Sequence, residues 1–223
     1  MTLVPDFRGF EHPLDQVVHS HPVKPRKSIM YRMIKRAFDI GFSSVILLPA
    51  MLIVGAALFV VNPFFNPGPL FYAQKRMGRD CKPFRALKFR TMRVTTRDRR
   101  GPDDPVDQRR ITPLGQVLRR SRFDELPQIL NVYRGDMSLI GPRPDYFRHA
   151  HHYMRAIPDY RARHMVRPGI SGLAQIRHGY AEGLDATRRK TTADLDYIRN
   201  ANLGLDLWIF WRTIVTVVRL RGT

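Results

Sequence analysis

The chain is poor in cysteine and in acidic side chains. Cys81 is its one cysteine among 223 residues, which excludes an intrachain disulfide and suits a reducing compartment. Only 19 Asp and Glu face 38 Lys and Arg, so the formal net charge is +19. Such a charge attracts polyanions, namely nucleic acids, anionic lipid headgroups or phosphorylated small molecules. Composition does not choose among these three.

Several common chemical motifs are absent from the sequence. It contains no G-x-x-x-x-G-K-[ST], no G-x-G-x-x-G after a predicted strand, no C-x-x-C and no H-E-x-x-H. The cluster "HAHHY" holds His149, His151 and His152, but helix neighbours need a spacing of three or four to share a face. We therefore interpret these histidines as solvated or interfacial, with metal binding as the weaker alternative.

One long apolar run, residues 40–61, carries no charge and is long enough to cross a bilayer as a helix. Pro49 lies near its middle and would remove a helix hydrogen bond. Both flanks are basic, and the positive-inside tendency draws both to the cytoplasm. We predict a re-entrant membrane helix over residues 28–62 that is broken at Pro49. A kinked spanning helix and a buried helix of a soluble protein are the alternatives.

The rest of the chain is predicted to be an α+β fold that is mostly helical. Residues 1–27 lack periodicity and are interpreted as a flexible N-terminal arm. Residues 63–223 are expected to form a catalytic domain on the cytoplasmic face, with a short β-hairpin around "MGRD" and interfacial amphipathic helices. The segment "LGLDLWIFWRTIVTVVRLRG" near the end has Trp208 and Trp211 on an apolar stripe. This stripe fits either the membrane interface or core packing.

Two adjacent carboxylates, Asp124 and Glu125, lie in an arginine-rich stretch, "RRSRFDELPQILNVYRG". If Asp124 opens a helix that runs to Arg134, it is an N-cap at the positive end of the helix dipole. The same helix end would favour an arriving phosphate. Arg143 in "GPRP" and Arg119 upstream could bind phosphate oxygens in a bidentate manner. A carboxylate nucleophile that forms an acyl phosphate is therefore the second interpretation.

Four ordered motifs support that second interpretation. They are "KRAFD" (35–39), "LKFRTM" (87–92), "FDELPQILNVYRGDMSLIGPRP" (123–144) and "VRPGISGLAQI" (166–176). Together they resemble the bacterial monotopic phosphoglycosyl transferases, the initiating sugar transferases of exopolysaccharide and glycan assembly. The resemblance covers about residues 31–220.

The resemblance implies a specific reaction. Such enzymes transfer a sugar-1-phosphate from a UDP-sugar to undecaprenyl (polyprenol) phosphate and release UMP. By position in the motif, Asp124 is the nucleophile of a covalent phosphosugar-aspartyl intermediate, and Glu125 is its catalytic neighbour. The implied cofactor is Mg²⁺, held by Asp124 and, as a second ligand, Glu125.

The resemblance also implies roles for the basic motifs. The residues assigned to phosphate and substrate binding are Arg119, Arg143, Arg167, Gly169, Lys88 and Arg90. Those assigned to the membrane and the lipid phosphate are Lys35, Arg36 and Pro49. The expected location is the bacterial inner membrane, with anionic lipids as partners and without nucleic acid. Whether two copies form a homodimer stays open.

The sequence departs from the family pattern at two positions. Leu48 precedes Pro49 where many relatives have Ser, which leaves Ser44 as the nearest hydroxyl one turn earlier. Leu173 stands where Trp is common, and this bears on sugar preference more than on chemistry. The competing functions are a basic nucleic-acid-binding protein, which lacks stacking aromatics here, and a membrane scaffold without activity.

Overall fold

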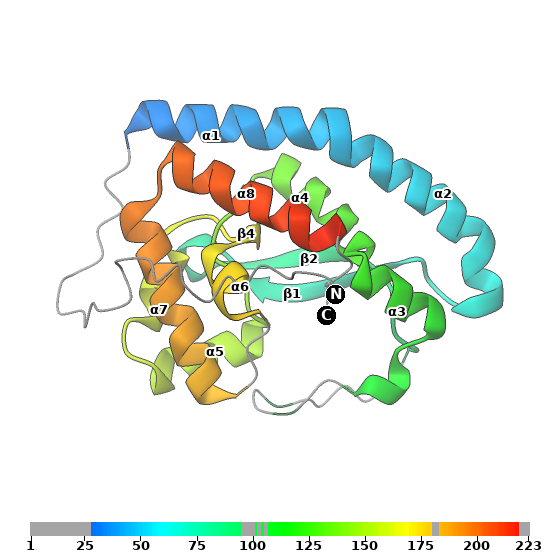
Figure 1. Cartoon of the computed structure of the whole chain (residues 1–223). Coiled ribbons are helices and arrows are strands. Elements are labelled where there is room, and N and C mark those ends of the chain that lie inside the picture. The colour runs from blue at the N-terminus through cyan, green and yellow to red at the C-terminus, as the bar shows by residue number, and fades with distance from the viewer. Residues whose placement is uncertain (1–27, 95–100, 102–103, 105–106, 180–182, 219–223) are drawn as a thin grey trace, which may run out of the picture.

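The structure is a computed structural model that describes residues 28–94, 101, 104, 107–179 and 183–218. The predicted arm, residues 1–27, lies outside the described residues. Within them the fold is mostly helical with two small sheets (Figure 1), which confirms the predicted α+β class. The helices are α1 (Ile29–Phe42), α2 (Leu48–Phe65), α3 (Pro113–Arg120), α4 (Ile129–Arg134), α5 (Phe147–Ala156), α6 (Leu173–His178), α7 (Leu184–Asn200) and α8 (Leu203–Val218). The strands are β1 (Phe71–Met77), β2 (Pro83–Phe89), β3 (Ser138–Ile140) and β4 (Gly169–Ser171).

The apolar run forms the middle of one helical segment rather than two separated pieces. A π-helical turn, Ser43–Leu47, joins α1 to α2, and the segment bends there without reversing (Figure 1). Proline cannot donate a backbone hydrogen bond, and its ring crowds the preceding turn. The Leu48 N–H bonds to the Ser43 carbonyl, five residues back, so a widened turn accommodates Pro49. The predicted break is therefore wrong in form, because a bend replaces it, and the helix extends to Phe65. Its re-entrant path stays a prediction.

This long helix packs along the domain on one side only. Met51 and Leu58 share a buried cluster with Phe89 of β2 and Ile129 of α4. The remaining circumference is apolar yet exposed, with large side chains that include Val45, Leu52, Ile53, Phe59, Val60, Phe64 and Phe65. One helix of the described part is thus long and apolar enough to cross a membrane.

The β-hairpin is present as predicted. Strands β1 and β2 pair antiparallel, with Phe71 opposite Phe89 and Met77 opposite Pro83. Asp80 and Cys81 in the connecting turn have φ of 55° and 59°, the left-handed conformation that closes it. Strand β2 carries the first three residues of "LKFRTM" and contacts the segment that holds the two carboxylates.

A second sheet was not predicted. Strands β3 and β4 pair in parallel, with Ser138 opposite Gly169. This pairing brings the segments "DMSLIGPRP" and "VRPGIS" together. Their backbones touch: a Cβ on Gly169 would lie 2.1 Å from the Gly141 nitrogen. Only glycine permits this approach. The "RPGISGLAQIRHG" stretch contains β4 and the short helix α6.

One face of the amphipathic helix α8 packs in the core, and its position at the membrane interface stays a prediction. Ile209 is fully buried, and the Phe210 ring packs edge-on against Phe42 of α1. Trp208 and Trp211 on the other face are exposed. Figure 1 shows α8 lying beneath α1, and the contact between Phe210 and Phe42 joins the two helices.

Candidate active site

The two carboxylates lie inside a tight 3₁₀ segment, Phe123–Gln128, that leads into α4. The N-cap position belongs to Arg122, in the left-handed conformation with φ 61°, so the prediction that Asp124 is the N-cap was wrong. Pro127 has no N–H to donate within the first turn, and the chain tightens to an i to i+3 bond from Glu125 N to Arg122 O, 3.1 Å. Asp124 still lies in the first helical turn, where the dipole favours an anion.

One lysine and one arginine surround the carboxylates. Lys88, from β2, donates to Asp124 Oδ2 at 3.3 Å and to Glu125 Oε1 at 2.7 Å. Arg143, from the "GPRP" loop, donates to Glu125 Oε2 at 2.9 Å and through Nη2 to Oε1. Both carboxylate residues are only 6% exposed. Four residues predicted from sequence to share the site thus converge on it.

The surroundings shift the pKa values of the two carboxyl groups in opposite directions. Burial would raise the pKa of Glu125, but the charges of Arg143 and then Lys88 outweigh it and hold that pKa well below its usual range. Burial raises the pKa of Asp124; Lys88 opposes the rise, and the Glu125 charge adds to it. Glu125 is therefore a fixed anion in an ion pair, whereas Asp124 is the more basic of the two.

Arg119 of α3 bonds to a residue of another motif. Its Nε donates to Thr91 Oγ1 at 3.0 Å, which connects α3 to "LKFRTM". The backbone of α3 lies so close to Thr91 that a Cβ on Gly115 would be 2.0 Å from the Thr91 carbonyl oxygen. Thr112 caps the helix and accepts from Gly115 N at 3.0 Å. The orientation of Arg119 is consequently fixed, and its role in phosphate binding stays a prediction.

Arg90, predicted to bind phosphate, is instead surrounded by protein acceptors. It is 6% exposed. Its guanidinium donates to Pro69 O (2.7 Å), Met92 O (2.9 Å), Asn66 Oδ1 (2.9 Å) and Asn66 O. These bonds use four of its five N–H groups. Arg90 fastens the end of α2 to the hairpin and does not join the two carboxylates.

The "RPG" loop lies on the other side of Arg143. Arg143 Nη1 donates to Ile170 O of β4 at 3.1 Å, so the "GPRP" and "RPGIS" motifs meet at this arginine. Arg167 points elsewhere and donates through Nε to Gly135 O at 2.9 Å, at the end of α4. Gly169 provides close backbone packing, as described above. Nothing places Arg167 or Gly169 against the carboxylates, and their substrate contacts stay predictions.

The basic pair of α1 is engaged within the domain. Lys35 Nζ bonds to Asp206 Oδ2 of α8 at 2.9 Å, and Arg36 Nη2 donates to Tyr133 O of α4 at 3.3 Å. Both side chains hold α1 to the helices below it. Ser44, the hydroxyl considered one turn before Pro49, pairs with the Tyr133 hydroxyl at 3.0 Å.

The carboxylates of the site fit Mg²⁺ only as a partial set of ligands, completed by substrate phosphates. The described residues hold no group of three or more His, Cys, Asp or Glu side chains that could enclose a metal ion. The hydrogen bonds of those residues leave Oδ1 of Asp124 without a donor, while Glu125 is occupied by Arg143 and Lys88. Mg²⁺ is commonly held by one or two carboxylates together with substrate phosphates, and Asp124 can supply one.

Sequence reasoning missed two buried polar groups. Asp206 accepts hydrogen bonds from Lys35, Tyr31 and Tyr197. A lone carboxylate in the apolar stripe of α8 was the available signal. The second group centres on Arg163, which is 2% exposed. No periodic or motif signal distinguished that arginine from the others in its segment.

The comparisons with known proteins agree with these motifs. A model of the bacterial sugar transferase family matches residues 30–220. The UDP-N-acetylgalactosamine-undecaprenyl-phosphate N-acetylgalactosaminephosphotransferase of Aeromonas hydrophila is 42% identical over 191 residues, covering 86% of this chain and 45% of its own.

Two further relatives carry one name, UDP-glucose:undecaprenyl-phosphate glucose-1-phosphate transferase. The protein of Caulobacter vibrioides is 39% identical, covering 93% of this chain and 80% of its own, and that of Escherichia coli is 36% identical, covering 95% and 47%. The chain therefore spans about half the length of two of these three relatives. The family match over nearly the whole chain, with the buried Asp-Glu pair and its basic partners, shows that the chain belongs to the bacterial sugar transferase family.

Proposed function

We propose that this chain is an enzyme that transfers a sugar-1-phosphate from a UDP-sugar to undecaprenyl phosphate and releases UMP. The observation that carries the proposal is the buried Asp124–Glu125 pair bridged by Lys88, with Arg143 on Glu125. The names of the relatives support the substrates.

Asp124 is the nucleophile because its neighbour is fully engaged. Both oxygens of Glu125 accept hydrogen bonds from cations, whereas Asp124 has one longer contact to Lys88. In the first step an Asp124 oxygen attacks the phosphorus attached to the sugar. The bond from that phosphorus to the oxygen bridging to UMP breaks, and UMP leaves with that oxygen. The product is an acyl phosphate that carries the sugar.

The basic residues make this attack feasible. An anionic nucleophile and an anionic phosphate repel one another, and cations close to both lower that repulsion. Lys88 contacts Asp124 directly, and Glu125 keeps Lys88 in place by its shorter bond. Arg119, fixed by Thr91, has terminal nitrogens for the phosphate oxygens. When bound, Mg²⁺ would neutralise phosphate charge, with Asp124 as its ligand from this chain.

The second step regenerates the enzyme. A phosphate oxygen of undecaprenyl phosphate attacks the same phosphorus, and the bond to Asp124 breaks. The sugar diphosphate lipid is formed, and Asp124 is again a carboxylate. Lys88 then stabilises the departing carboxylate through the contact that it makes in the resting state.

The lipid substrate requires a membrane position, and we infer a re-entrant one. Asp39 of α1 accepts from Leu139 N at 3.1 Å, and Leu58 of α2 is buried in the cluster that holds Phe89 of β2. Both halves of the helix are thus fastened to one domain, which does not fit a helix whose ends lie on opposite sides of a bilayer. The exposed apolar face would lie in one leaflet, with the domain at the cytoplasmic surface of the inner membrane.

The test is a reaction of the purified protein with UDP-sugars and undecaprenyl phosphate. We expect UMP release that Asp124→Asn abolishes while the protein stays in the membrane fraction. Asp136→Asn, which changes a carboxylate beyond the end of α4, is the matched control and should retain activity. Release of UDP in place of UMP would contradict the proposed transfer.

A further inference from the structure

The main chain that carries Arg143 is held by an unusual set of donors. Four consecutive carbonyls, those of residues 142–145, each accept a hydrogen bond from elsewhere in the fold. Gly169 N bonds to Pro142 O at 3.0 Å, and Met77 N bonds to Asp145 O at 3.1 Å. The two middle carbonyls accept from arginine side chains: Arg163 Nη2 to Arg143 O at 2.8 Å, and Arg76 Nη1 to Pro144 O at 2.6 Å.

Arg163 is itself fixed from several sides. Its Nε and Nη2 donate to Asp194 Oδ2 of α7 at 3.0 and 2.6 Å, and its Nη1 contacts Asp145 and the Tyr160 hydroxyl. Lys190 pairs with the other oxygen of Asp145. Two cations and two carboxylates therefore balance inside the domain, which is the arrangement a buried charge requires.

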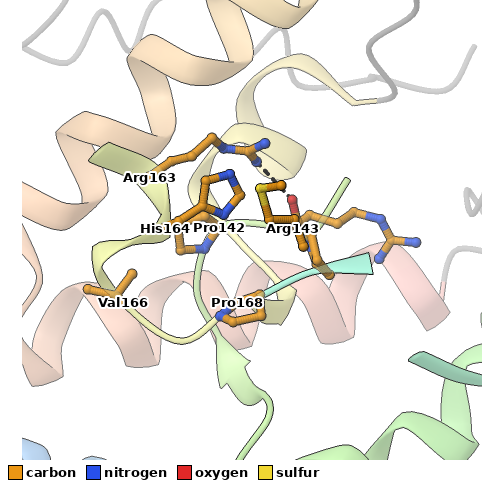
Figure 2. Close-up of a pocket in the computed structure, with 8 residues that line it drawn as sticks. Pro142, Arg143, Arg163, His164, Val166 and Pro168 are labelled. Carbon is orange, nitrogen blue, oxygen red and sulfur yellow. Dashed lines mark hydrogen bonds between the residues drawn. The ribbon is translucent and has the colours of Figure 1, made fainter. Parts of the chain in front are cut away.

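Figure 2 shows Arg163 directed at the carbonyl of Arg143, on the side away from the Arg143 guanidinium. The guanidinium of Arg143 points away from Arg163 and donates to Glu125. Arg143 is thus held at both ends, by Arg163 on its main chain and by Glu125 on its side chain. A shift of this main chain would move the guanidinium relative to Glu125.

We propose that Arg163, together with Asp194, is a positioning residue that sets Arg143 for phosphoryl transfer. This rests on the proposed function, since Arg143 matters through the Asp124–Glu125 pair. A lysine at 163 keeps the charge but cannot bond to Asp194, Asp145 and the Arg143 carbonyl together in one planar array. Its effect should appear in the reaction and not only in stability.

The test compares Arg163→Lys with Tyr160→Phe. The second variant removes a hydroxyl from the same cluster, which contacts Asp145 and Arg163, and leaves the Arg163 bond to Arg143 O intact. We expect kcat/KM for UMP formation to fall roughly 10- to 100-fold in Arg163→Lys, since small misplacements of positioning groups have effects of that order. Tyr160→Phe should stay within about twofold.

A comparison of kcat with KM separates positioning from simple destabilisation. If Arg143 is displaced, kcat per folded molecule should carry most of the fall in Arg163→Lys, with KM for the UDP-sugar little changed, and neither should change in Tyr160→Phe. Should Arg163→Lys fail to fold, Asp194→Asn, which weakens the hold on Arg163, should give a smaller fall in kcat.

Two results would overturn the inference. One is a loss of activity in Arg163→Lys that only follows the amount of folded protein, with kcat per folded molecule unchanged. The other is equal effects in Arg163→Lys and Tyr160→Phe. A wild-type protein that forms no UMP with any UDP-sugar would instead contradict the proposed function itself, so the two failures are distinguishable.

Discussion

Replacing Lys88 by methionine tests how the site keeps two carboxylates together. Lys88 contacts both Asp124 and Glu125, and its side chain is 17% exposed. Glu125 would keep Arg143 as a counterion, so the loss falls mainly on Asp124. A hydrogen bond to a charged group contributes roughly 1.5–3 kcal/mol. At about 1.4 kcal/mol per factor of ten, kcat/KM should fall roughly 10- to 100-fold.

The pH dependence should change in a defined direction. Burial raises the pKa of Asp124, and Lys88 is the largest opposing influence. Without Lys88 that pKa rises further, so Asp124 becomes protonated at higher pH and loses its nucleophilic form. The acid limb of the kcat profile should therefore move to higher pH in Lys88→Met.

The assay is UMP formation from a UDP-sugar over a range of pH, with Lys82→Met as the control. Lys82 is exposed in the turn of the same hairpin, and its removal costs the same unit of charge. The reasoning would be refuted if the two variants had equal rates and equal pH profiles, since the effect would then be one of net charge alone.

Three further predictions concern stability, each measured by thermal or denaturant unfolding in detergent. Burial lowers the pKa of His164 from 6.5 to about 3, so between pH 7 and 5 the unfolded chain binds a proton at this residue that the folded chain does not. The free energy of unfolding should therefore fall by about 2 kcal/mol from pH 7 to pH 5. His164→Gln should remove this loss, and the exposed His151→Gln should not. Gly169→Ala should lower the free energy of unfolding by about 3 kcal/mol or more, because its Cβ would meet the Gly141 backbone. Gly41→Ala, which has open space around it, should not. Equal free energies of unfolding in the two variants would contradict the close packing. Asp206→Ala leaves the half-buried Lys35 without its counterion and the Tyr31 and Tyr197 hydroxyls without their acceptor, and should cost roughly 3 kcal/mol. The exposed Asp185→Ala should cost little.

The parts of the fold that were predicted correctly have local causes. The helix predicted to run to Arg134 ends there because Gly135 takes the left-handed conformation, and such a cap depends on a few adjacent residues. The hairpin could be predicted for the same reason. Asp124 was assigned to the wrong cap position because the left-handed Arg122 and the 3₁₀ turn leave no mark in residue type.

The missed parts depend on pairing between distant segments. Strands β3 and β4 have three residues each, too few for an alternating pattern, and they pair across about 30 positions of sequence. The sequence contains both glycines, but it does not reveal that Gly141 and Gly169 pack against one another. Sequence alone could not supply that partner.

The candidate site shows the same division. Motif order brought Asp124, Glu125, Lys88 and Arg143 together, as the structure does. The sequence could not distinguish the roles of Lys88 and Arg90, which are two residues apart. Arg90 donates to backbone carbonyls, whereas Lys88 donates to the carboxylates. Strand alternation would place both on one face, so only the acceptors around each decide its role.

The most direct test of the central claim is to trap the aspartyl intermediate. The protein is incubated with a UDP-sugar labelled at the phosphate next to the sugar, without undecaprenyl phosphate, and the labelled peptide is then identified. The account predicts one phosphosugar on Asp124 with an equal amount of UMP, and none in Asp124→Asn. UMP formed only when both substrates are present, with no label on the wild-type protein, would contradict it.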